Sequence, residues 1–231
     1  MSVSPECWAI IPAAGIGQRM AASMPKQYLK LGDKTILEHA AHVLLNDARI
    51  THVVFALHET DSYFSQLTLD QPHKIRSVIG GETRAHSVLN AMHAIQEEVK
   101  ADDFVLVHDA ARPCLQKTDL NKLMDVCLNH AVGGILAAPV TDTIKHVQAN
   151  EIDSTVEREH LWRAFTPQMF KYKLLYDALT QALSDNVLIT DEASAMEYMQ
   201  HKPCVVEGST HNIKVTSPDD LVMAEMYLTS K

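Results

Sequence analysis

Short apolar runs alternate with amphipathic stretches along most of the chain. The runs are the expected buried strands, and they span 8–11, 53–57, 75–79, 104–107 and 134–138. Apolar positions recur at helical spacing between them, as over 36–45 and in a helix that starts near Thr83. Such alternation is typical of α/β proteins. The pattern therefore predicts a Rossmann-like, mainly parallel sheet with helices on both faces.

The C-terminal part of the chain continues the alternation. The expected elements are helices near 172–183 and 191–199 and short strands at 204–206 and 213–215. The last helix has the clearest start, because Ser217 can cap it and Pro218 suits its first position. Thr166-Pro167-Gln168 is expected to form a turn.

The segment 141–163 breaks the pattern. It is polar, alternates only weakly and has no good helix face, and it is long for a loop. We expect a protruding β-hairpin arm of the kind that packs on a neighbouring subunit. No linker or repeat divides the chain, so residues 1–231 are expected to form a single domain with this arm.

Composition narrows the possible functions. The chain has 20 Lys and Arg against 29 Asp and Glu, a net charge of −9, which disfavours nucleic-acid binding. No apolar run approaches the roughly 18 residues of a membrane span. The four cysteines are far apart and are expected to be reduced thiols of a cytoplasmic protein; they are Cys7, Cys114, Cys127 and Cys204.

The loop after the first strand, residues 12–20, is the best candidate for binding phosphate. Its small residues and glycines let the backbone approach an anion, and Arg19 and Lys26 bring positive charge. Met20 stands where a dinucleotide-binding loop needs a third Gly or Ala, and no Walker sequence is present. The alternative is a plain turn with solvated charges.

Two further segments follow predicted strands. Gly80 and Gly81 would let the backbone approach a flat base that Ser87 could hydrogen-bond, or they could form an ordinary capped turn. Asp109 could hold a divalent cation and Arg112 a phosphate, or the two could pair to organise the turn. The spacing of the 13 histidines matches no metal site.

Taken in order, the motifs resemble the 2-C-methyl-D-erythritol 4-phosphate cytidylyltransferase family, from about residue 8 to 228. The motifs that carry the resemblance are Ala13-Ala14-Gly15-x-Gly17-x-Arg19-Met20, Pro25-Lys26-Gln27-Tyr28, Asp109-Ala110-Ala111-Arg112-Pro113, Thr141-Asp142-Thr143, Thr166-Pro167-Gln168, Thr190-Asp191-Glu192-Ala193-Ser194 and Asn212-Ile213-Lys214-Val215-Thr216. The resemblance implies a nucleotidyltransferase-type fold. It also implies transfer of a cytidylyl group from CTP to the sugar phosphate in the non-mevalonate isoprenoid pathway, with Mg²⁺ and no organic cofactor.

The same resemblance assigns residues to roles. Those implied to bind the nucleotide are Ala13, Ala14, Gly15, Gly17, Arg19, Lys26, Gly81, Glu82, Ser87 and Ala110. Those implied to bind the polyol phosphate are Asp109, Arg112, Thr143, Arg158, Thr166, Thr190 and Lys214. The catalytic charges would be Arg19, Lys26, Arg158 and Lys214, and Asp109 would be a metal ligand. Arg158 would reach from the arm into the partner subunit's site in a homodimer.

Three alternatives remain at this point. A ribitol 5-phosphate cytidylyltransferase shares most of the motifs and the same chemistry. An NAD-dependent oxidoreductase is disfavoured by Met20. A non-catalytic nucleotide-binding regulator is disfavoured because both Arg19 and Lys26 are present.

Overall fold

The computed structural model describes residues 5–15 and 24–229. Gly17 and Arg19, two residues predicted to bind phosphate, lie outside these ranges. Within them, the main sheet has seven strands in the order β11-β7-β10-β6-β1-β4-β5. Their bounds are β1 (Cys7–Pro12), β4 (Ile50–Leu57), β5 (Ile75–Ile79), β6 (Phe104–Val107), β7 (Gly133–Pro139), β10 (Trp162–Lys171) and β11 (Cys204–Glu207). All neighbours are parallel except the pairs that β10 makes.

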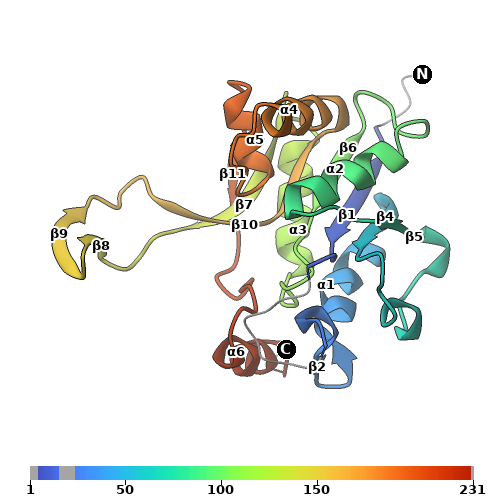
Figure 1. Ribbon diagram of the computed structural model, residues 1–231, viewed down its shortest axis with the longest axis horizontal. Helices are drawn as coiled ribbons and strands as arrows, with labels where there is room; N and C mark the ends of the chain where they lie inside the picture. The colour runs from blue at the N-terminus through green and yellow to red at the C-terminus, as the bar shows by residue number, and fades with distance from the viewer. Residues whose placement is uncertain (1–4, 16–23, 230–231) are drawn as a thin grey trace.

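Helices cover both faces of this sheet, as the alternation predicts (Figure 1). Their bounds are α1 (Ile36–Leu45), α2 (Arg84–Ala94), α3 (Lys117–Cys127), α4 (Tyr172–Ser184), α5 (Glu192–Tyr198) and α6 (Pro218–Thr229). Leu44 of α1 and Leu123 of α3 pack on one face, and Met92 of α2 and Leu179 of α4 pack on the other. Because both faces are buried, the strands need continuous apolar runs rather than alternating ones.

A short hairpin and three 3₁₀ helices are also described outside the main sheet. They are the hairpin β2 (Lys30–Leu31) and β3 (Lys34–Thr35), and the 3₁₀ helices η2 (Lys26–Tyr28), η3 (Phe64–Gln66) and η4 (Pro72–Lys74). The end of the chain returns to this hairpin, because α6 shares a small apolar cluster with Leu31 and Val215. Ser217 caps α6 as predicted, since its Oγ accepts a hydrogen bond from Asp220 N at 3.3 Å.

Two expectations about local structure are wrong. Thr166-Pro167-Gln168 is not a turn but the middle of β10, the one antiparallel strand of the sheet. The pairing of β10 with β7 shifts in register between Ala164 and Gln168, where Pro167 has no N–H to donate. Residues 213–215 form no strand either; Val215 N instead donates to Ala111 O at 2.8 Å.

The arm is confirmed as a β-hairpin made of β8 (Ile144–Gln148) and β9 (Glu151–Val156). Figure 1 shows it standing far out from the sheet, beyond the ends of β7 and β10. A hydrogen bond from Val140 N to Leu161 O at 2.9 Å closes its base. Nearly all of its residues are exposed, so this chain alone gives the arm no apolar surface to pack against.

Candidate active site

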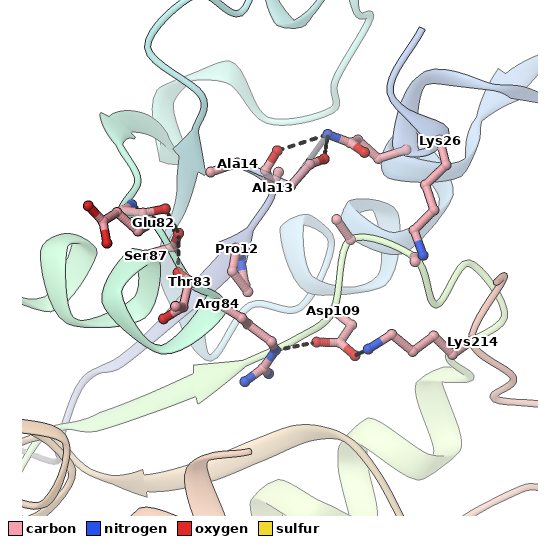
Figure 2. A pocket seen from close by; sticks show the side chains of 15 residues that line it. Pro12, Ala13, Ala14, Lys26, Glu82, Thr83, Arg84, Ser87, Asp109 and Lys214 are labelled. Carbon is pink, nitrogen blue, oxygen red and sulfur yellow. Dashed lines mark hydrogen bonds and ion pairs between the residues drawn. The ribbon is translucent and has the colours of Figure 1, made fainter. Parts of the chain in front are cut away.

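A cavity of about 330 Å³ opens at the edge of the sheet where β1, β5 and β6 end. In parallel sheets the loops that follow these ends are the usual place for a ligand. Figure 2 shows side chains from three such loops around the cavity, with Pro12, Glu82 and Asp109 from separate strands. We call it the first pocket.

The loop after β1 is held by its backbone. Ala13 N donates to Ala56 O at 2.8 Å, and the Gln27 amide donates to Ala13 O at 2.8 Å and to Gly15 O at 3.2 Å. The Gln27 side chain is buried, so it fixes the loop without reaching solvent. Gln27 belongs to the motif Pro25-Lys26-Gln27-Tyr28, but its role could not be predicted from the sequence alone. Only the side-chain contacts reveal that it braces the predicted phosphate loop.

Close packing explains the two glycines after β5. A Cβ added at Gly80 would lie 2.6 Å from the Cβ of Ala14, so glycine lets this loop touch the loop after β1. Gly81 N donates to Ser87 Oγ at 3.0 Å, and Ser87 Oγ donates to Thr83 O at 2.9 Å. The Ser87 hydroxyl therefore shapes the loop that faces the cavity.

A chain of ions forms one wall of the first pocket. Arg84 Nε donates to Asp109 Oδ1 at 2.7 Å, and Lys214 Nζ lies 2.8 Å from Asp109 Oδ2 (Figure 2). Arg84 Nη1 and Nη2 donate to the two carboxylate oxygens of Glu192 at 2.6 and 2.9 Å. Arg112 Nε adds a further positive charge 3.7 Å from Asp109 Oδ2. Three cations thus face two carboxylates, which leaves this wall net positive and suited to an anion.

Asp109 is charged because of these neighbours. Its burial acts to raise its pKa, but the charges of Arg84, Lys214 and Arg112 outweigh burial and hold the pKa of Asp109 well below its ordinary value. Burial lowers the pKa of Arg84, but Glu192 and Asp109 reverse that effect and raise it. The ions therefore stabilise one another away from water.

Sequence reasoning missed Arg84 and Glu192. Arg84 occupies the first turn of α2, where a solvated charge is common, and Glu192 opens α5 like an ordinary first-turn acid. They meet across 108 positions of sequence. Local pattern carries no signal for such a contact.

A second pocket, of about 250 Å³, adjoins the first. The predicted polyol-phosphate residues that line it are Asp109, Arg112, Thr166, Thr190 and Lys214. Among the described residues, three side chains line both pockets: Arg84, Asp109 and Lys214. The structure therefore gathers these predicted residues from four separate segments at the boundary between two cavities.

Hydrogen bonds behind the second pocket hold Thr166 in place. Its Oγ1 accepts from Asp109 N at 3.0 Å and lies 2.9 Å from His108 Nδ1. His108 Nε2 lies 3.1 Å from the carbonyl oxygen of Arg112, which can only accept, so Nε2 carries the proton and Nδ1 accepts from Thr166. Burial lowers the pKa of His108 to about 4, so the ring is neutral at pH 7. His108 is a structural residue, consistent with giving no histidine a catalytic role.

The remaining predicted residues fall in different places. Lys26 Nζ borders the first pocket and donates to Val215 O at 3.0 Å, and Ala13, Ala14, Gly15, Gly81, Glu82, Ser87 and Ala110 line the same pocket. Thr143 and Arg158 line neither cavity. Both are exposed on the arm, where Arg158 Nη1 donates to Thr141 O. One chain does not bring them to the site.

A family model described as "2-C-methyl-D-erythritol 4-phosphate cytidylyltransferase" matches residues 7–230. The chain belongs to this family. A curated cytidylyltransferase of this name from Vibrio vulnificus is 51% identical over 222 residues, covering 96% of this chain and 94% of the relative. Its counterpart from Salmonella typhimurium is 52% identical over 223 residues, covering 96% and 93%.

The fold of this chain is also similar to solved structures of cytidylyltransferases. The crystal structure of the Francisella tularensis family member has a TM-score of 0.84 and 37% identity, covering 96% of this chain and 99% of that one. A 4-diphosphocytidyl-2C-methyl-D-erythritol synthase gives a TM-score of 0.85 at 36% identity, covering 98% and 100%. The predicted family, nucleotidyltransferase fold and enzyme class are confirmed, against the oxidoreductase and the non-catalytic regulator.

Among residues 5–15 and 24–229, no cluster of three or more His, Cys, Asp or Glu could hold a metal ion by itself. In the same part of the chain, no helix is long and apolar enough to cross a membrane. The four cysteines are free thiols, as predicted.

Proposed function

We propose that this chain transfers the cytidylyl group of CTP to 2-C-methyl-D-erythritol 4-phosphate, in isoprenoid precursor biosynthesis. The products are 4-diphosphocytidyl-2-C-methyl-D-erythritol and pyrophosphate. Family membership over nearly the whole chain supports this activity. The observation that carries it is the pair of adjoining pockets with a shared cationic wall, because the reaction brings two anions together.

CTP would occupy the first pocket. We assign the triphosphate to the loop after β1 and to Lys26, together with Gly17 and Arg19 outside the described residues. Gly81, Glu82, Ser87 and Ala110 would hold the cytosine and ribose. The polyol phosphate would take the second pocket, against Arg112, Thr166, Thr190 and Lys214.

This arrangement suits the chemistry of nucleotidyl transfer. An oxygen of the polyol phosphate attacks the α-phosphorus of CTP, the bond to the β-phosphate oxygen breaks, and pyrophosphate leaves with that electron pair. A phosphate monoester is already ionised at pH 7, so the reaction needs no general base. The protein instead aligns two anions and stabilises the charge that gathers on the transferred group. Lys26 and Lys214 both line the first pocket and would supply positive charge for that task (Figure 2).

We assign a magnesium ion to the same pocket. Mg²⁺ in nucleotide sites is usually held by substrate phosphates and by one or two carboxylates, so a site with few protein ligands fits it. Asp109 is the buried carboxylate of the first pocket and would be the protein's ligand. The ion would neutralise the triphosphate and its pyrophosphate leaving group.

The arm supports a homodimer. Val147 and Ile152 expose apolar surface on the hairpin, and Arg158 and Thr143 meet neither pocket of their own chain. We propose that the arm crosses to a second copy of the chain and places Arg158 beside that copy's second pocket. Residues 1–231 would then be one nucleotidyltransferase domain with a dimerisation arm. Four free thiols favour a cytoplasmic location.

Pyrophosphate release from CTP and Mg²⁺ tests the activity, with 2-C-methyl-D-erythritol 4-phosphate and ribitol 5-phosphate run in parallel. We expect release with the first substrate alone. Release with ribitol 5-phosphate alone would keep the fold and the cytidylyl chemistry but contradict the assignment to isoprenoid synthesis.

A further inference from the structure

Arg84 makes three directed contacts from one guanidinium. Nε reaches Asp109, while Nη1 and Nη2 form a two-pronged fork with Glu192. The side chain leaves the first residue of α2 and joins β6 to α5. Arginine suits this position because its planar fork donates in several fixed directions, whereas lysine has a compact ammonium that cannot form the two-pronged contact with Glu192.

Glu192 holds the Arg84 guanidinium in place. Its side chain is fully buried, and a buried carboxylate requires a partner of opposite charge. The residues on either side of it are tied to β10 through one amide: Ala193 N donates to Gln168 Oε1 at 2.9 Å, and Gln168 Nε2 donates to Asp191 Oδ2 at 2.8 Å. The start of α5 therefore cannot shift without breaking these bonds.

The ion chain lies where the substrates must meet. Within residues 5–15 and 24–229, the side chains that line both pockets are Arg84, Asp109 and Lys214. Bond formation between the polyol phosphate and the α-phosphate must occur at that boundary if each substrate keeps its own pocket. Lys214 is 42% exposed and can turn toward an anion. All three guanidinium nitrogens of Arg84 donate to carboxylates, of which Figure 2 shows that of Asp109.

We propose that Arg84, held in place by Glu192, is a positioning residue that determines where the two substrates meet. The proposal rests on the proposed function and adds two residues to it. By holding Asp109 Oδ1, Arg84 orients the carboxylate so that Oδ2 faces Lys214, and this sets the position from which the lysine ammonium turns toward an anion. Without this fork, Asp109 would turn toward Lys214 and Arg112 and draw both away from the phosphates.

The test compares R84K, E192Q and the double variant R84K/E192Q in steady-state turnover with CTP and 2-C-methyl-D-erythritol 4-phosphate. R84K keeps the charge but loses the fork, and E192Q keeps the shape but loses the charge. We expect kcat to fall by about 100-fold in each single variant, since a misplacement of about 1 Å costs that much, while both KM values stay within about threefold. The double variant should lose no more than the worse single, because the pair acts as a unit.

Arg76 and Glu98 provide a matched control. Arg76 forks Glu98 with Nη1 and Nη2 in the same way, but neither residue lines the two pockets. R76K and E98Q should leave kcat unchanged. Calorimetric titration with CTP and thermal unfolding, run on every variant, verify that each one is folded and binds nucleotide.

Three results would overturn the proposal. These are a kcat for R84K within about threefold of the wild type, single-variant losses that multiply in the double variant, or a loss confined to KM. If R84K does not fold, E192Q alone decides by the same kcat and KM criteria. Failure of the proposed function would appear in the wild-type enzyme, as no pyrophosphate release, whereas failure of this proposal appears only in the variants.

Discussion

The sheet body and the arm are both built from β-strands, but their side chains differ sharply in burial. Residues Gly133–Ala138 of β7 are buried, yet a few residues later the chain enters the hairpin of β8 and β9, where almost every side chain is exposed (Figure 1). In the body, charged side chains such as Asp109 and Glu192 are paired and buried. On the arm, Lys145 and Arg158 contact only arm residues near them.

The difference shows which part of the proposed site one chain can build alone. The body holds both pockets and the ion chain at their boundary. The arm carries two predicted substrate-binding residues, Thr143 and Arg158, away from both of these pockets of their own chain. A folded monomer would therefore bind nucleotide but lack part of the polyol-phosphate site.

The largest expected loss of turnover is for Lys26→Ala, a substitution in the sheet body. Lys26 borders the first pocket, and removing a charge-stabilising donor from a transition state costs on the order of 10²–10³ in turnover. Steady-state pyrophosphate release measures this loss. Lys30→Ala is the matched control, since Lys30 is a nearby lysine that donates to Asp33 O and does not line the pocket. Near-normal turnover in Lys26→Ala would remove Lys26 from the proposed site.

The substitution Arg158→Ala tests the contribution of the arm to turnover. We expect turnover to fall on the order of 10²-fold while CTP affinity stays unchanged, because the described residues that line the proposed nucleotide pocket all belong to the body and none to the arm. Calorimetric titration with CTP, alongside the turnover assay, separates the two quantities. Lys145→Ala, on the same hairpin, should leave both unchanged. Weakened CTP binding in Arg158→Ala would contradict the division between body and arm.

A smaller effect is expected on stability in Thr166→Val. The valine cannot accept from Asp109 N or donate to His108 Nδ1, so both buried groups lose a partner. Such a loss costs about 1–3 kcal/mol in the free energy of unfolding. Denaturant unfolding measures it against Thr155→Val, an exposed threonine on the arm. Equal unfolding free energies for the two variants would show that the buried network contributes nothing.

Much of the fold could be predicted from the chain itself. The parallel strands β1 and β6 are short apolar runs buried on both faces, and such runs are visible without any structure. The first helix was equally clear, because apolar residues recur at helical spacing over 36–45; the structure adds a capping box of Thr35 and Glu38 at its start. Residues that follow strand ends, such as Gly81 and Asp109, met at one edge of the sheet as the topology requires.

The errors lie where distant parts of the chain decide the structure. Thr166-Pro167-Gln168 has the composition of a turn, yet pairing with β6 and β7 on either side makes it part of a central strand. The Arg84–Glu192 fork joins two helix starts, each of which has a satisfactory local explanation. Local pattern cannot distinguish a solvated first-turn charge from one half of a buried ion pair.

Mixing the Lys26→Ala and Arg158→Ala variants tests most directly whether each active site combines the body of one protomer with the arm of its partner. Lys26→Ala lacks a body residue and Arg158→Ala lacks an arm residue, so in a mixed dimer one site combines the intact body of one protomer with the intact arm of its partner. After the two proteins are unfolded and refolded together, we expect about a quarter of wild-type turnover per protomer, because half of the dimers are mixed and each has one complete site. Turnover no higher than that of the separate variants would contradict the crossing of the arm.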